Sequence, residues 1–288
     1  MSSLGWLAQP AVLPWFALGF GLCVGSFLNV VIHRLPKMLE REWRAECAEL
    51  AGQPAPQEPP LSLVSPRSRC PSCGHAIRAV ENIPLVSWLA LRGKCSKCGT
   101  RISARYPLVE LLAGVGAAYS TWRFGPTMAA LGAALFVWFT IALAFIDQET
   151  GLLPDDLTLP LVWVGLIVNL GGAFVTLPEA VIGAVAGYLV LWLVYWGFKL
   201  ATGKEGMGYG DFKLLAALGA WLGWQMLLPI VLGAAGVGAL LGIAMIVTGQ
   251  RDRGIPMAFG PYLAAAGWLA MLFGPELVAS YLSLYARP

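Results

Sequence analysis

Eight apolar stretches occupy most of this sequence, and they restrict the chain to folds that suit a lipid bilayer. A helix needs about 20 mostly apolar residues to cross the ~30 Å hydrocarbon core of a membrane. The stretches lie at residues 12–32, 107–122, 127–146, 157–175, 179–198, 212–224, 226–247 and 258–284, of which the second and sixth are short. We therefore predict an all-α polytopic membrane protein with about eight transmembrane helices.

The composition agrees with a membrane location. Hydrophobic residues make up 58% of the chain and charged residues only 12%, about half of the roughly 25% found in soluble domains. The first apolar stretch has no basic segment before it and no small-residue cleavage site after it, so we expect it to stay as an anchor. The net charge of +3 comes without a basic stripe interleaved with aromatic residues, which argues against nucleic acid as a partner.

The basic residues predict the orientation of the chain in the membrane. Of the 19 Lys and Arg residues, 12 lie between Arg34 and Arg105, and the positive-inside bias places that loop in the cytoplasm. Threading eight spans from there puts loops 147–156, 199–211 and 248–257 on the same side. Lys199, Lys204, Arg251 and Arg253 agree with this orientation, whereas Arg123 and Arg287 fall outside.

We predict three parts along the chain. Residues 1–33 form the first transmembrane helix, residues 34–105 form a cytoplasmic loop domain, and residues 106–288 form a helical bundle in the membrane. The loop domain contains a Pro-rich stretch at residues 51–60, which we expect to be an extended spacer.

Two Cys-x-x-Cys pairs follow that spacer. Cys70 and Cys73 form one pair, Cys95 and Cys98 form the other, and each pair is followed by glycine. Four thiolates at this spacing suit a tetrahedral structural zinc site, which would fold a domain too small to hold a core. Two disulfides are the alternative, although a cytoplasmic location keeps thiols reduced. The other two cysteines, at 23 and 47, have no partner by spacing and are expected to be free thiols.

Two acidic residues stand at the ends of apolar stretches. Asp147 ends the run Phe145-Ile146-Asp147, and Asp211 follows the glycines of Gly208-Tyr209-Gly210. A carboxylate at membrane depth is costly to bury, by roughly 2.5–3.5 kcal/mol or more, and is therefore a candidate for function. The predicted topology places both acids at the cytoplasmic ends of their helices. Such a pair suggests an aspartic protease, in which one carboxylate accepts a proton from water while its protonated neighbour polarises the scissile carbonyl.

Three further charged residues lie close to these two acids in the sequence. Pro154 predicts a helix break, after which Asp155 or Asp156 is expected to cap the next helix, with a supporting catalytic role as the alternative. Lys213 is two residues beyond Asp211 and does not share a helical face with it, so snorkelling or substrate positioning is expected of it.

Taken together, these motifs resemble the prepilin leader peptidase family over nearly the whole chain. The matching segments appear in the family's order. They are Gly25-Ser26-Phe27-Leu28-Asn29-Val30 with Arg34 and Pro36, the paired cysteines, Glu81-Asn82-Ile83-Pro84, Arg105-Tyr106-Pro107 with Glu110, Asp147 to Asp155, and Gly208-x-Gly210-Asp211.

The resemblance implies a multi-pass aspartic endopeptidase of the bacterial cytoplasmic membrane. Its substrates would be type IV prepilins and type II secretion pseudopilins, cut after a glycine at the cytoplasmic face to remove a short basic leader. The catalytic dyad would be Asp147 and Asp211. The resemblance also implies N-methylation of the new N-terminal residue with S-adenosylmethionine, an activity associated with the cysteine-containing loop. The sequence itself shows no Rossmann-type glycine motif, so we assign no residue to this cofactor from the sequence.

Other functions remain open at this point. A peptidase without methyltransferase activity would be expected to lack the cysteine loop. An intramembrane protease of the presenilin or signal-peptide-peptidase kind shares Gly-x-Gly-Asp but is not expected to have the four cysteines. A non-enzymatic scaffold or transporter would spread its acids along a path through the bilayer, whereas here they gather at one edge. Asn29, Arg34 and Glu110 could contact substrate or cofactor, or anchor helix ends at the interface.

Overall fold

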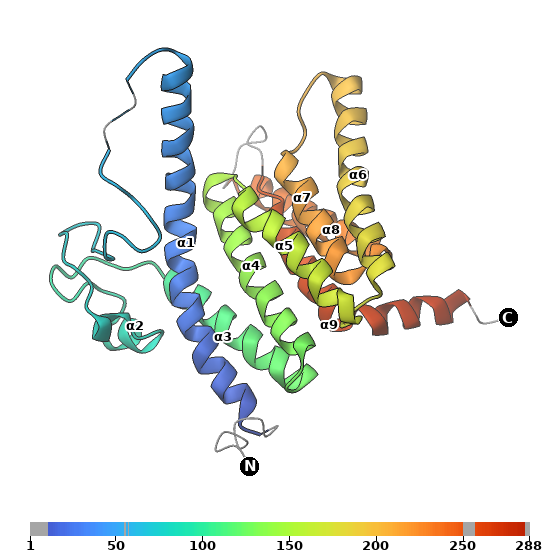
Figure 1. Ribbon diagram of the computed structural model, residues 1–288, viewed down its shortest axis with the longest axis horizontal. Coiled ribbons are helices and arrows are strands. Elements are labelled where there is room, and N and C mark those ends of the chain that lie inside the picture. The colour runs from blue at the N-terminus through green and yellow to red at the C-terminus, as the bar shows by residue number, and fades with distance from the viewer. Residues whose placement is uncertain (1–10, 55, 57, 250–256, 286–288) are drawn as a thin grey trace. The chain divides into compact units, whose positions relative to one another are not determined.

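The computed structural model describes residues 11–54, 56, 58–249 and 257–285. Three of the basic residues that bear on the predicted orientation, Arg251, Arg253 and Arg287, lie outside the described residues, as do Ala55 and Gln57 of the Pro-rich stretch. Within the described part the chain is helical (Figure 1), and its only β pairings are two isolated bridges in the cysteine loop. The predicted all-α class is therefore confirmed.

Each of the eight predicted apolar stretches contains a helix. These helices are α1 (Leu13–Leu50), α3 (Arg105–Phe124), α4 (Met128–Thr150), α5 (Asp155–Val168), α6 (Leu177–Thr202), α7 (Tyr209–Leu222), α8 (Leu227–Val247) and α9 (Gly260–Tyr285). In the described residues, four helical segments are long and apolar enough to cross a membrane: α1, α4, α6 and Trp224–Val247, which includes α8. Their number and hydropathy make this a membrane protein.

The chain divides into two compact units, residues 1–142 and 143–288, and α4 contributes to both. The three-part division along the sequence stays a prediction.

In the first unit, α1 and α3 pack closely because small residues line their contact. A Cβ atom added to Gly21 would lie 2.7 Å from the Ala113 carbonyl oxygen, and one added to Gly25 would lie 2.6 Å from the Glu110 Cα. Small residues allow this approach where no hydrophobic force drives helices together in lipid. The contact fixes the membrane end from which the cysteine loop begins and to which it returns.

Helix α1 is longer than the apolar stretch that predicted it. It continues through Pro36 to Leu50, and its charged second half extends beyond the apolar window. Arg34 lies buried at the junction, where its guanidinium donates to the backbone carbonyls of Ser62 and Pro66. The arginine therefore ties the returning loop to the end of the apolar half of the helix.

In the second unit, α7 is surrounded by other helices. Nearly all of its residues from Asp211 to Leu222 are buried, and it packs against α5, α6 and α9. A helix that is apolar all round belongs inside a bundle. Its 14 residues span about 21 Å at 1.5 Å per residue, which is shorter than the hydrocarbon core.

One buried amide fixes the far end of α7. The Asn169 side chain donates to the carbonyls of Ala220 and Trp221 at 2.9 and 3.1 Å, and it accepts the backbone N–H groups of Phe174 and Val175. It thus satisfies carbonyls that a helix end leaves without partners. The first turn of α7, which contains Asp211, is therefore positioned by a helix anchored at its other end.

Candidate functional site

A cavity of about 890 Å³ lies in the second unit and contains both candidate acids. Asp147 reaches it from the last turn of α4, and Asp211 reaches it from the first turn of α7. The two side chains are nearly buried, with 6% and 7% of their residue surface exposed. They are also within electrostatic reach of each other. The fold therefore brings together two carboxylates that are 64 positions apart in the sequence.

Asp147 is held by the start of α9. The backbone N–H of Gly260 donates to Asp147 Oδ2 at 2.8 Å, and this hydrogen bond is buried. The first N–H groups of a helix have no partner within the helix, so a carboxylate at that end is well placed. One oxygen of Asp147 is thereby fixed.

The loop between α4 and α5 packs against the first turns of α7 and α9. A Cβ atom added to Gly210 would lie 2.6 Å from Leu153 Cβ, and one added to Gly260 would lie 3.2 Å from Leu153 Cδ2. Leu153 thus fills the space between the residue before Asp211 and the residue that binds Asp147. Gly210 and Gly260 are glycines because these approaches leave no room for a side chain.

One face of α8 also lines the cavity. Its lining residues follow the spacing of a single helical face and include two glycines and two alanines. They are Ala235, Gly238, Ala239, Gly242, Ile243 and Ile246. This wall is apolar, and its glycines and alanines add little side-chain bulk to the cavity that contains the acids.

The positions of Asp155 and Asp156 differ from those predicted from the sequence. The N-cap of α5 is Pro154, which makes no side-chain cap, so the expectation that Asp155 or Asp156 caps this helix was wrong. Both acids lie in its first turn, where a carboxylate still interacts favourably with the helix dipole. Lys213 Nζ donates to both carboxylate oxygens of Asp155, at 2.6 and 2.7 Å.

In the first unit, the two cysteine pairs fold into matching knuckles. In each, the backbone N–H of the first cysteine donates to the carbonyl five residues later, and the glycine N–H donates back to the first cysteine. Gly74 and Gly99 have φ of +69° and +71°, which glycine adopts without strain. The glycine after each pair is therefore required by the turn.

The four thiols converge on one point. Cys70 Sγ lies 3.8 Å from Cys98 Sγ, Cys73 Sγ lies 4.0 Å from Cys95 Sγ, and all four sulfur atoms lie within 4.8 Å of one another. Zinc–sulfur bonds of about 2.3 Å in a tetrahedron imply sulfur–sulfur distances of about 3.8 Å. The cysteines are free rather than disulfide-bonded. The cluster could therefore hold a metal ion, and four thiolates would leave no open position for catalysis.

Glu81 joins the two knuckles. Its carboxylate accepts hydrogen bonds from the Arg78 backbone N–H at 2.9 Å, from Ser96 Oγ at 2.6 Å and from His75 Nε2 at 3.2 Å. The Arg78 and Ser96 bonds lower the pKa of Glu81 from 4.5 to about 2. This residue is thus charged at neutral pH and cross-links the cysteine loop around the sulfur cluster.

The loop is attached to α3 through a buried carboxylate. Glu110 Oε2 accepts the backbone N–H of Leu85 at 2.8 Å, and Leu85 has a positive φ of 59°, which is uncommon for leucine. Nearby, Asn29 Nδ2 donates to the Tyr106 carbonyl at 3.0 Å. These contacts give Asn29 and Glu110 structural partners between the helix ends and the loop.

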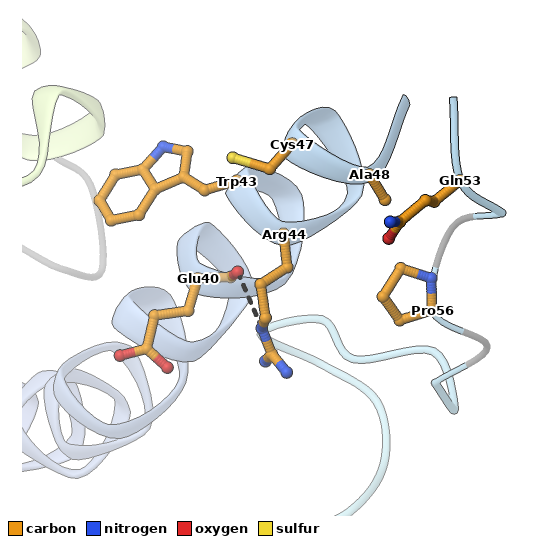
Figure 2. Close-up of a pocket in the computed structure, with 7 residues that line it drawn as sticks. All are labelled: Glu40, Trp43, Arg44, Cys47, Ala48, Gln53 and Pro56. Carbon is orange, nitrogen blue, oxygen red and sulfur yellow. Dashed lines mark hydrogen bonds between the residues drawn. The ribbon is translucent and has the colours of Figure 1, made fainter. Parts of the chain in front are cut away.

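A second cavity, of about 640 Å³, is open and lies at the end of α1 (Figure 2). Trp43, Glu40 and Arg44 line it from the helix, and Gln53 and Pro56 line it from the following turn. The guanidinium of Arg44 already has partners: Nη1 pairs with Glu58 at 2.9 Å, and Nε donates to the Glu40 carbonyl. We assign no ligand to this groove.

Models of known protein families match segments in both units of the chain. Residues 20–124 match the bacterial peptidase A24 N-terminal domain, and residues 134–243 match the type IV leader peptidase family. The chain belongs to the type IV leader peptidase family. No solved structure matches it.

Among its relatives are three proteins named prepilin leader peptidase/N-methyltransferase. The one from Stutzerimonas stutzeri is 54% identical over 281 residues, which is 97% of both chains. The one from Aeromonas hydrophila is 56% identical over 277 residues, 94% of this chain and 96% of the relative. The one from Pseudomonas aeruginosa is 53% identical over 284 residues, 98% of both chains. The family resemblance drawn from the sequence is thus confirmed.

Proposed function

We propose that this chain is a membrane aspartic endopeptidase that removes the leader peptide from prepilins and pseudopilins, with Asp147 and Asp211 as its catalytic dyad. The observation that supports it most is the shared cavity, because two acids from different helices meet there in a chain of the type IV leader peptidase family. The relatives' names give the substrate class. The enzyme would act in the bacterial cytoplasmic membrane, and its large loop would lie in the cytoplasm.

The geometry suggests how the reaction proceeds. One carboxylate of the dyad takes a proton from a water molecule, which attacks the scissile carbonyl carbon, while the protonated partner donates a proton to the carbonyl oxygen. Two close carboxylates resist double ionisation, so the dyad titrates as a unit. Gly260 orients one oxygen of Asp147 for this work.

The cavity suits the substrate that the relatives' names imply. A precursor with a basic leader and an apolar helix places its leader in the cytoplasm and its helix in lipid. The small-residue face of α8 would admit the peptide backbone at the junction, which the family cuts after a glycine. The dyad stands at helix ends, the level at which that junction is expected.

We also propose that the chain methylates the new N-terminal amine, which the relatives' names support. S-adenosylmethionine would supply the methyl group. No residue of this chain is assigned to that cofactor.

Prepilin cleavage in liposomes tests the dyad. Asp147→Asn and Asp211→Asn keep the side-chain shape but remove the titratable proton, so we expect each to lower cleavage by at least about 100-fold, at the lower end of acid–base contributions. Asp156→Asn is the matched control, because Asp156 is exposed and does not line the cavity, and it should cut normally. Mass spectrometry of the product should show one added methyl group only with S-adenosylmethionine. Undiminished cleavage by both dyad variants would rule out these acids as catalysts.

We propose zinc as the ion held by Cys70, Cys73, Cys95 and Cys98, in a structural role. Replacing all four by serine should remove a stoichiometric metal and make the loop sensitive to protease, because the knuckles lose their common centre. The matched control is the Cys23→Ser/Cys47→Ser double variant, which removes the two remaining thiols and should retain the metal. Elemental analysis makes the comparison. A wild-type protein purified without zinc would contradict the assignment.

A further inference from the structure

One ion pair near the dyad has no place in the proposed chemistry. Lys213 Nζ contacts both oxygens of Asp155, and the two residues lie in the first turns of α7 and α5. Neither residue lines the cavity. Because Lys213 follows Asp211 by two positions, its side chain leaves α7 on another side from the Asp211 carboxylate. The pair therefore acts on the helices rather than on a ligand in the cavity.

The ion pair links the chain segments next to Asp147 and Asp211. Asp147 lies in the last turn of α4, and the loop 151–154 leads from the end of that helix to Asp155. From there the ion pair crosses to Lys213, two residues after Asp211. Leu153, inside the same loop, fills the space beside Gly210 and Gly260. Leu153 of the loop thus makes an apolar contact with the first turn of α7, and Asp155, the first residue of α5, makes an ionic one.

The exposure of the pair argues for positioning rather than for stability. The Lys213 and Asp155 side chains are 28% and 56% exposed. Exposed ion pairs add little to the free energy of unfolding. The rate of catalysis depends far more strongly on the positions of the catalytic groups, since a displacement of about 1 Å can lower a rate by roughly 100-fold.

We propose that Asp155 and Lys213 form a positioning pair that holds the first turn of α7 against the loop after Asp147, so that the two carboxylates keep the separation needed for catalysis. This inference rests on the proposed peptidase function. It assigns neither residue a contact with substrate.

A double-mutant cycle on cleavage tests the pair. Lys213→Met and Asp155→Asn remove charge while retaining similar size. Each should lower kcat by about tenfold and change KM less than about twofold, because the catalytic carboxylates are displaced but still present. The double variant should also lose about tenfold, since the second change removes nothing further. Lys213→Arg keeps the charge and should stay within about threefold of wild type. Independent losses that multiply to about 100-fold, or single variants with normal kcat, would overturn the proposal.

Substitutions of charged residues outside the ion pair are the controls. Lys204→Met and Asp156→Asn remove an exposed cation and an exposed acid that neither line the cavity nor join the pair. Both should leave kcat unchanged. Thermal unfolding of every variant should stay close to wild type, which separates positioning from loss of fold.

A labelling experiment tests the pair without relying on activity. Leu152→Cys, placed in the loop in a Cys23→Ala/Cys47→Ala background, reports how freely a maleimide reaches the cavity wall. Lys213→Met should raise the labelling rate several-fold, and Lys213→Arg should not. An unchanged labelling rate would show that the ion pair does not hold this loop in place, even if the dyad is catalytic. A raised rate in a chain whose dyad variants still cut would instead locate the failure in the peptidase proposal.

Discussion

Gly260 stands where a side chain would collide with a candidate catalytic carboxylate. A Cβ atom at this position would lie 2.8 Å from Asp147 Oδ2 and 3.2 Å from Leu153 Cδ2. We expect Gly260→Ala to push the carboxylate from its place and to lower prepilin cleavage by at least about tenfold, because small displacements of catalytic groups are costly. Steady-state cleavage in liposomes measures the effect.

The matched control for that substitution is Gly236→Ala on α8. A Cβ atom there would meet nothing within 4 Å, so cleavage should be unaffected. If Gly260→Ala cuts as well as Gly236→Ala, Asp147 tolerates displacement and the orienting role of the glycine is wrong.

Sequence alone proposed the chemical groups of the candidate site but not the contacts that position them. Acids at membrane depth and paired cysteines are conspicuous because each is costly or rare in its setting. The partners of these acids lack such a signal. Gly260 binds a carboxylate 113 positions away, and Lys213 binds one 58 positions away. Only the packing of α4, α5, α7 and α9 makes those residues neighbours.

The helices themselves were predictable where hydropathy alone decides, and less so where packing decides. Each apolar stretch became a helix, and Pro154 does mark the break between α4 and α5. The length of α1 was not predicted, because its second half is charged and continues through Pro36. The depth of α7 in the bundle also depends on its neighbours, since its composition matches that of a membrane span.

Helices α6 and α7 cross at a point that only glycine permits. A Cβ atom on Gly183 would collide with the carbonyl oxygen of Gly219, and one on Gly219 would collide with that of Gly183. Gly183→Ala should therefore separate the helices and reduce the free energy of unfolding by about 1–3 kcal/mol, the usual range for overpacking. Thermal unfolding in detergent measures the loss.

Another glycine on the same helix provides the comparison. Gly197→Ala places its Cβ in open space, so it should unfold at the wild-type temperature or slightly above, since alanine favours the helix. Equal melting temperatures for the two variants would show that the α6–α7 crossing adjusts without cost.

Two features of the molecule bear on how it is placed in the membrane. The first is structural. Loop residues 151–153 and 205–208 line the same cavity as the dyad, so the ends of α4 and α6 must lie on one side of the bilayer. The second is the distribution of charge, in which 12 of the 19 basic residues fall between Arg34 and Arg105 and favour the cytoplasm for that loop.

Labelling of one introduced cysteine at a time, in the Cys23→Ala/Cys47→Ala background and in intact cells, tests both features. Thr150→Cys and Lys204→Cys replace exposed residues at those two helix ends, and we expect both to be protected from a membrane-impermeant maleimide added outside. Thr127→Cys, exposed in the short connection between α3 and α4, should be labelled from outside. Labelling of only one of positions 150 and 204 would contradict the shared cavity. Labelling of both, with protection at position 127, would preserve the cavity but invert the charge-based orientation, and a basic leader would then have to cross the membrane before it could be cut.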